Sequence, residues 1–225
     1  MKNLTTQAFV GLVQLVVLLA VLLFLPAWSI NYWKAWVFLL VFGVSVFLIT
    51  VYFLRKDPEL IQSRLKVGPV AEQQTSQKVI QALASIFFIL PFVTASLDHR
   101  FGWSSVPTWI VLLGDVLVAL GLYIVFLVFR ENTFTSATIE VQDEQKVIST
   151  GPYALIRHPM YSGAFIMLLG IPLALGSWWA LIFVFLLFAA IVWRLLEEEK
   201  FLSKNLSGYT NYRQKVRYRL IPYIW

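Results

Sequence analysis

The sequence of 225 residues contains no cysteine, only two histidines and few charged residues. Without cysteine the chain cannot form disulfides, thiolate zinc sites or a cysteine nucleophile. The two histidines, His99 and His158, are too few for a histidine-rich metal site, so we expect no metal. Charged residues make up 13% of the chain and hydrophobic residues 59%, whereas soluble domains carry about 25% charged residues. This composition predicts one integral membrane domain.

Long apolar runs predict the membrane-spanning helices. A span needs about 20 mostly apolar residues, and we expect spans over 8–25, 33–54, 79–97 and 108–129. No small-residue cleavage site follows the first run, so we expect it to stay as a helix. Segment 160–193 is too long for one span, and Pro172, Gly176 and Ser177 near its middle predict two helices. The predicted fold is therefore all-α, with about five to six transmembrane helices, the last two forming a hairpin.

The positions of the basic residues predict the orientation in the membrane. If the N-terminus is cytoplasmic, only Lys34 and Arg100 of the 18 lysines and arginines fall on the outer side. Cytoplasmic loops are enriched in lysine and arginine, so we expect both termini to be cytoplasmic. The net charge of +6 then suits loops that face anionic lipid. The expected partners are membrane lipids and no nucleic acid.

A long polar loop, 130–161, divides the chain into N-terminal transmembrane helices (1–130) and a candidate catalytic, cofactor-binding region (131–225). Loops of this length inside compact domains are uncommon and often functional. Pro152 and Pro159 fix their own φ and disfavour the helical conformation in the residues before them. His158 is thereby placed just before a helix that starts near Met160, whose free amides can receive electron-rich groups. An interfacial turn and the floor of a cofactor pocket both remain possible interpretations.

The segment "WRLLEEEKFL", 193–202, places charges at the end of the last span. Arg194 and Glu198 are one helical turn apart and share a face. Ionisable groups in membrane helices are functional candidates. Alternatively, the acidic run marks where the helix enters water, and Arg194 extends to the interface. We favour a paired role for Arg194 and Glu198.

Two glycines in the span 108–129, Gly114 and Gly121, predict close packing against a neighbouring helix, because small residues let membrane helices approach each other.

The segments "GPYALIRHPMY" (151–161), "RLLEEEKFL" (194–202) and "GYTNYRQKV" (208–216) together resemble the isoprenylcysteine carboxyl methyltransferase family. The wider group also includes phospholipid N-methyltransferases, and the resemblance covers roughly 132–222. It implies transfer of a methyl group from S-adenosylmethionine to a lipid-attached acceptor at the membrane face. It also implies that Arg194 lies on the substrate side and acts in catalysis with Glu198. The cofactor pocket it implies is lined by Lys146, Val147, Ile148, Tyr153, His158, Pro159, Met160, Tyr161 and Glu198.

The chemistry favours a carboxylate acceptor on a lipid or a prenylated molecule. A carboxylate is ionised at neutral pH and needs no general base, and Arg194 would orient it but repel an ammonium group. Three alternatives remain open. In the first alternative the acceptor is a phospholipid amine. In the second the protein is an NADPH-dependent reductase, since membrane sterol reductases carry a related "HP.Y" segment and a similar tail. In the third the chain is a non-enzymatic scaffold or small transporter.

Overall fold

The computed structural model describes residues 2–64, 75–134 and 145–225, and the regular secondary structure in these ranges is helical. This confirms the predicted all-α class. Five helices are long and apolar enough to cross a membrane. They are α1 (Lys2–Ala27), α2 (Trp33–Lys56), α4 (Thr75–Phe101), α5 (Thr108–Glu131) and α7 (Ala180–Asn205). The shorter elements are α3 (Pro58–Arg64), a 3₁₀ turn (Gly151–Ala154), α6 (Pro159–Ala174) and α8 (Tyr209–Lys215).

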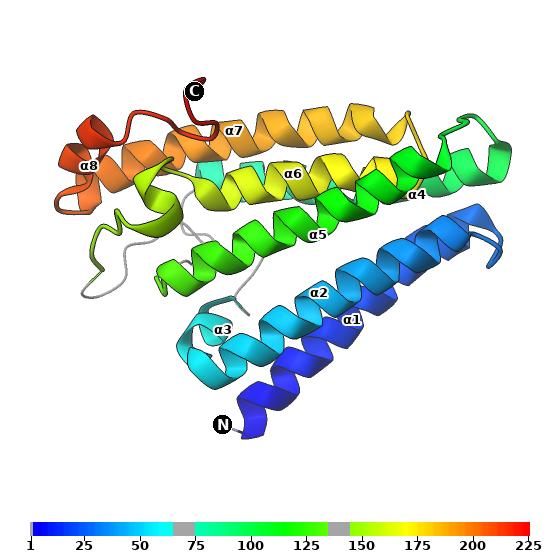
Figure 1. The fold of residues 1–225 in the computed structure, drawn as a ribbon, viewed down its shortest axis with the longest axis horizontal. Helices are drawn as coiled ribbons and strands as arrows, with labels where there is room; N and C mark the ends of the chain where they lie inside the picture. The colour runs from blue at the N-terminus through cyan, green and yellow to red at the C-terminus, as the bar shows by residue number, and fades with distance from the viewer. Residues whose placement is uncertain (1, 65–74, 135–144) are drawn as a thin grey trace.

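The long helices form an elongated bundle with two different ends (Figure 1). Both chain termini, α3 and α8 lie at one end, which we call the site end. The connections from α1 to α2, from α4 to α5 and from α6 to α7 lie at the far end. Lys34 and Arg100 belong to the far end because they start α2 and end α4. This arrangement agrees with termini that share one side of a membrane, and the side they face remains a prediction.

The turn from α2 to α3 follows from the sequence Asp57-Pro58. Proline suits the first turn of a helix, where its missing N–H is not needed. Asp57 precedes it, and its side-chain Oδ1 accepts a hydrogen bond from Leu60 N at 3.1 Å. This contact caps α3, which ends at Arg64 beside the other helices at the site end. The sequence Gly68-Pro69 also predicts a break in this connection, and it lies outside the described residues.

Helices α5 and α6 pack with their backbones in close approach, as the glycines predicted. A Cβ atom added at Gly114 would lie 2.2 Å from Ala174 N, and one at Gly121 would lie 2.5 Å from Gly163 O. Because real Cβ contacts are never this short, both positions accept only glycine unless the backbone shifts. The close approach sets the position of α6, whose first residues belong to the candidate site.

The predicted α6–α7 hairpin is confirmed, and its turn is held by polar groups at the far end. The Ser177 hydroxyl donates to the buried carboxylate of Asp98, and Ala180 N donates to Ser177 Oγ at 3.2 Å. The Tyr32 hydroxyl donates to Leu175 O at 2.7 Å. These contacts join α4 and the α1–α2 connection to the hairpin. These far-end contacts therefore fix the positions of α6 and α7. At the site end, the same two helices carry the "HPMY" and "EEE" segments.

Candidate active site

The "RHPMY" turn is fastened to the C-terminal segment by backbone hydrogen bonds. Arg157 N donates to Tyr218 O and His158 N donates to Arg219 O, each at 2.9 Å. The Ser162 hydroxyl adds a third bond, to Leu220 O at 2.6 Å. His158 has non-helical backbone angles (φ −125°, ψ 61°) and precedes α6 directly, as the two prolines predicted. The tyrosines, tryptophan and basic residues of the tail are typical of a lipid interface, and the structure gives part of this segment an internal role as well.

The buried carboxylate of Glu199 holds this turn and the tail against α7. Glu199 is only 3% exposed. Its Oε1 accepts from Arg157 Nε at 2.6 Å and lies 3.3 Å from His158 Nε2, and its Oε2 accepts from Arg219 Nε at 3.0 Å. A buried charge is tolerated where opposite charges and hydrogen bonds compensate its desolvation. Glu199 therefore acts as a junction between three segments that are far apart in the sequence.

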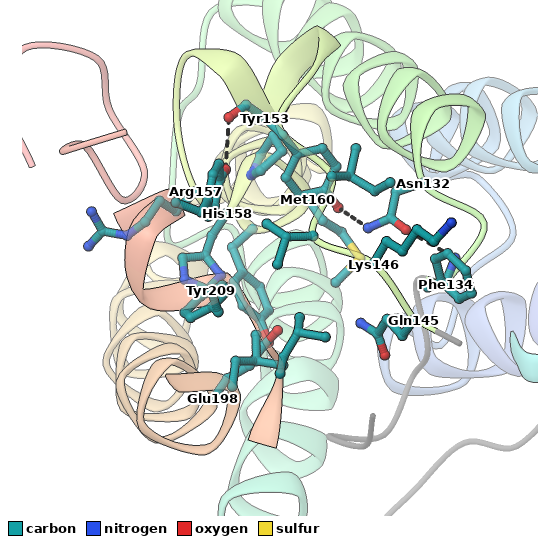
Figure 2. A pocket seen from close by; sticks show the side chains of 17 residues that line it. Asn132, Phe134, Gln145, Lys146, Tyr153, Arg157, His158, Met160, Glu198 and Tyr209 are labelled. Carbon is teal, nitrogen blue, oxygen red and sulfur yellow. Dashed lines mark hydrogen bonds between the residues drawn. The ribbon is translucent and has the colours of Figure 1, made fainter. Parts of the chain in front are cut away.

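The guanidinium of Arg157 is bound into this junction through its Nε and Nη1 atoms. Besides its bond to Glu199, its Nη1 donates to Val216 O at 2.8 Å and to Arg217 O at 2.7 Å. Figure 2 shows this side chain directed away from the other labelled residues. Arg157 thus orders the loop, while its charge is unavailable to a ligand.

Beside the junction lies a cavity, which we call the inner cavity (Figure 2). The volume of the inner cavity is about 110 Å³. Its lining includes all nine residues that the resemblance assigned to the cofactor: Lys146, Val147, Ile148, Tyr153, His158, Pro159, Met160, Tyr161 and Glu198. The structure also places residues there that sequence reasoning did not name: Asn132, Phe134, Gln145, Arg157, Leu202, Leu206, Tyr209 and Tyr212.

Tyrosines dominate one wall of the inner cavity. The Tyr153 hydroxyl accepts from Asn132 Nδ2 at 3.1 Å, and the Tyr212 hydroxyl donates to Tyr153 O at 2.8 Å. Burial raises the pKa of Tyr153 to about 12, so its hydroxyl stays protonated at neutral pH. The Tyr209 hydroxyl is buried and meets no hydrogen-bond partner among the described residues. This wall therefore offers neutral aromatic faces and one unused hydroxyl.

A second, larger cavity adjoins the first, and we call it the groove. The volume of the groove is about 480 Å³. Its walls are mainly apolar side chains of α1, α4, α6 and α7, and Leu18 and Ile89 on its wall are exposed. The ionisable groups on its lining are Arg64, Tyr161, Arg194 and Glu198. Such a groove suits an apolar chain that carries a polar head.

Met160, Tyr161 and Glu198 line both cavities and so form the boundary between them. The Tyr161 hydroxyl donates to Glu198 Oε2 at 2.6 Å, which fixes the carboxylate at this boundary. Arg194 lines the groove only, where its Nη1 donates to Gln77 Oε1 at 3.3 Å. The sequence-predicted residues are thus brought together, with Arg194 on the opposite side of the boundary from the inner cavity.

Comparison with known families bears on this arrangement. The phospholipid methyltransferase family model matches residues 109–208. The match runs from α5 through the "HPMY" turn to the end of α7, and it includes all ten predicted site residues. It supports the wider group to which the resemblance pointed and hence a membrane methyltransferase, without distinguishing methyl transfer to oxygen from transfer to nitrogen. A comparison with curated proteins found no match.

Sequence reasoning missed Glu199 and the tyrosines of the inner cavity for different reasons. The run of three glutamates gave no local sign of which carboxylate faces the interior, and only the packing of α7 assigns Glu199 to the junction. Tyr209 and Tyr212 stand in "GYTNYRQKV", a segment that was part of the resemblance. The polar and charged residues around these tyrosines gave no hint that they are buried.

Proposed function

We propose that this protein is an integral membrane methyltransferase that uses S-adenosylmethionine and methylates a lipid-attached acceptor, with a carboxylate as the favoured acceptor group. The observation that carries the proposal is the boundary formed by Met160, Tyr161 and Glu198. A methyl transfer needs donor and acceptor in adjoining pockets with their reacting atoms in line. A polar inner cavity that meets an apolar groove provides this arrangement for a water-soluble donor and a lipid acceptor.

The residues of the inner cavity fit a cationic, aromatic-containing cofactor. When bound, S-adenosylmethionine supplies a methyl group on a positively charged sulfur. The carboxylate of Glu198 suits that charge, and aromatic rings such as those of Tyr153 and Tyr209 attract cations at their faces. Lys146 would bind the amino-acid carboxylate of the same molecule, and the unpartnered Tyr209 hydroxyl would hydrogen-bond to one of its polar groups.

On the acceptor side, Arg194 would orient a carboxylate head at the floor of the groove. Transfer to a carboxylate oxygen would form the bond from oxygen to the methyl carbon and break the methyl–sulfur bond, whose electron pair would stay on sulfur. No proton is released, so no general base is required. The task of Tyr161 and Glu198 is then positioning and electrostatic stabilisation, which contribute most of the catalysis in such displacements.

A phospholipid amine is the second candidate acceptor, because the matching family is described as phospholipid methyltransferases. An ammonium group must lose a proton before it can accept a methyl group, and Glu198 is the nearest carboxylate on the groove lining. Arg64 and Arg194 line the same groove and would repel an ammonium group at short range. The charges of the groove therefore favour the carboxylate.

An NADPH-dependent reductase fits the inner cavity less well. Its cofactor carries several phosphate charges, and the cationic side chains on the described lining are Lys146, His158 if protonated, and Arg157. Arg157 is already committed to Glu199 and to backbone carbonyls. Glu198 would repel phosphate. The described lining thus offers little positive charge to hold several phosphate groups.

Calorimetric binding of S-adenosylhomocysteine to purified protein tests the cofactor assignment. We expect micromolar binding by the wild type and loss of at least about tenfold in affinity in Tyr209→Phe, the change that one buried hydrogen bond supports. Glu198→Gln is measured with S-adenosylmethionine, because only that ligand carries the sulfonium charge, and it is expected to lose affinity by at least about tenfold. Glu197→Gln is the matched control, because Glu197 pairs with the exposed Lys200 and lines neither cavity. Folded wild-type protein that binds NADPH but no S-adenosylhomocysteine would refute the proposal.

A further inference from the structure

Arg64, at the end of α3, has a half-buried side chain, and its guanidinium has unused hydrogen-bonding capacity. Its Nη2 donates to Met160 Sδ at 3.0 Å, and the guanidinium carbon lies 4.4 Å from the centre of the Phe129 ring. Its Nε is buried and has no hydrogen-bond partner in the described parts of the chain. A thioether sulfur is only a weak acceptor, and a buried donor without an acceptor is unfavourable. The position therefore calls for an oxygen ligand.

Arg64 keeps its positive charge despite this burial. The pKa of Arg64 is lowered to about 10, and burial is the main cause. The nearby Arg194 contributes to this lowering, while Tyr153, Tyr161 and Glu198 oppose it. The group is therefore protonated at neutral pH. Two guanidinium groups, Arg64 and Arg194, face one carboxylate, Glu198, on the lining of the groove. The described ionisable residues of the groove thus leave an excess of positive charge beside apolar walls.

These features describe one kind of occupant: an apolar chain that ends in an anion. The Nε and Nη2 atoms of a guanidinium lie side by side, and a planar carboxylate can accept from such a pair with two parallel hydrogen bonds. Met160, which contacts Arg64, also lines the inner cavity. An anionic head held by Arg64 would therefore lie at the boundary where the two cavities meet.

We propose that Arg64 is a specificity-determining residue that, together with Arg194, binds the carboxylate head of a single-chain lipid at the floor of the groove. This inference rests on the proposed function only in taking that lipid as the methyl acceptor. Arg64 lies outside the segment that matches the methyltransferase family, residues 109–208. The N-terminal half of the chain would thus select the acceptor, while the C-terminal half carries the methyl-donor site.

The test uses full-length protein in phosphatidylcholine nanodiscs and radiolabelled palmitate as the probe. We expect the wild type to bind palmitate, and unlabelled palmitate to compete at least about tenfold better than hexadecanol, as the loss of a charged hydrogen bond predicts. Arg64→Gln is expected to abolish this preference while it leaves S-adenosylhomocysteine binding within about threefold, a change that is small against one charged hydrogen bond. Arg64→Lys, which keeps the charge but not the paired donors, is expected to lie between the two.

Arg55→Gln is the matched control, because Arg55 is exposed and lines neither cavity. Equal competition by palmitate and hexadecanol in the wild type would overturn the inference, and this comparison does not depend on any variant folding. Palmitate preference retained in folded Arg64→Gln would also overturn it, as would stronger competition by hexadecyl phosphate than by palmitate. If the wild type binds palmitate through Arg64 but no S-adenosylhomocysteine, the proposed function fails and the anion site stands.

Discussion

Replacing Glu199 by glutamine removes the negative charge at the junction of α7, the "RHPMY" turn and the tail. Glutamine keeps the size of the side chain, so the change leaves the buried guanidinium of Arg157 opposite a neutral group. The Arg157 and Glu199 side chains are 5% and 4% exposed, so solvent compensates little, whereas Arg219 is 27% exposed and contributes less. Loss of one partner of a buried pair costs about 3–5 kcal/mol. We take about 3 kcal/mol because glutamine still accepts one hydrogen bond.

We expect this loss of stability to favour local opening between the "RHPMY" turn and the tail. The two segments are joined there only by the Glu199 junction and by a few hydrogen bonds among the described residues. About 3 kcal/mol corresponds to roughly a hundredfold increase in the open population. The amides of Arg157 and His158 donate to Tyr218 O and Arg219 O, so they report the opening directly. Hydrogen–deuterium exchange of the peptide that contains these amides should speed up by about two orders of magnitude in Glu199→Gln.

Glu197→Gln in the same helical turn is the control, because Glu197 forms its ion pair with the exposed Lys200 and not with the turn or the tail. Exchange in Glu197→Gln should match the wild type. If Glu199→Gln exchanges at the wild-type rate over 155–159, the assignment of Glu199 as the junction is refuted.

Two further changes separate packing from chemistry. Gly121→Ala should lower the apparent unfolding temperature in detergent strongly, because the new Cβ would lie 2.5 Å from Gly163 O; Gly43→Ala, whose Cβ would meet its nearest atom at 3.8 Å, should have little effect. Similar melting of both variants would contradict the described α5–α6 contact. Tyr161→Phe removes the 2.6 Å hydrogen bond to Glu198 and should lower methyl transfer about tenfold, as one charge-assisted hydrogen bond implies. An unchanged kcat in Tyr161→Phe would show that this bond does not position the reacting groups.

The fold was predictable because its signals are local. Long apolar runs mark the helices, and the residues Pro172, Gly176 and Ser177 mark the hairpin turn. The structure places that turn between α6, which ends at Ala174, and α7, which begins at Ala180. The predicted helix start near Met160 was accurate to one residue, because Pro159 can begin a helix but cannot continue one from His158.

The site was predictable only in part. Eight of the nine cofactor candidates lie within the short stretch 146–161, so a motif could bring them together without any knowledge of packing. The roles of Glu199 and Arg64 could not be predicted in this way, because they arise from contacts across 42 residues to Arg157 and 96 residues to Met160. Arg64 belongs to the polar segment 55–78 between two predicted spans. Nothing in that segment indicates which of its side chains lines the groove.

Methyl transfer itself tests the central claim most directly. Protein in nanodiscs would be incubated with S-adenosylmethionine labelled at the methyl group and with either N-acetyl-S-farnesylcysteine or phosphatidylethanolamine, and the lipid products would be treated with base. Methyl esters release labelled methanol under base, whereas methylated amines do not. We predict base-labile label on the carboxylate lipid, lost in Glu198→Gln and retained in Glu197→Gln. Base-stable label on phosphatidylethanolamine alone would contradict the carboxylate acceptor, and no label on either lipid from folded protein would contradict the methyltransferase assignment.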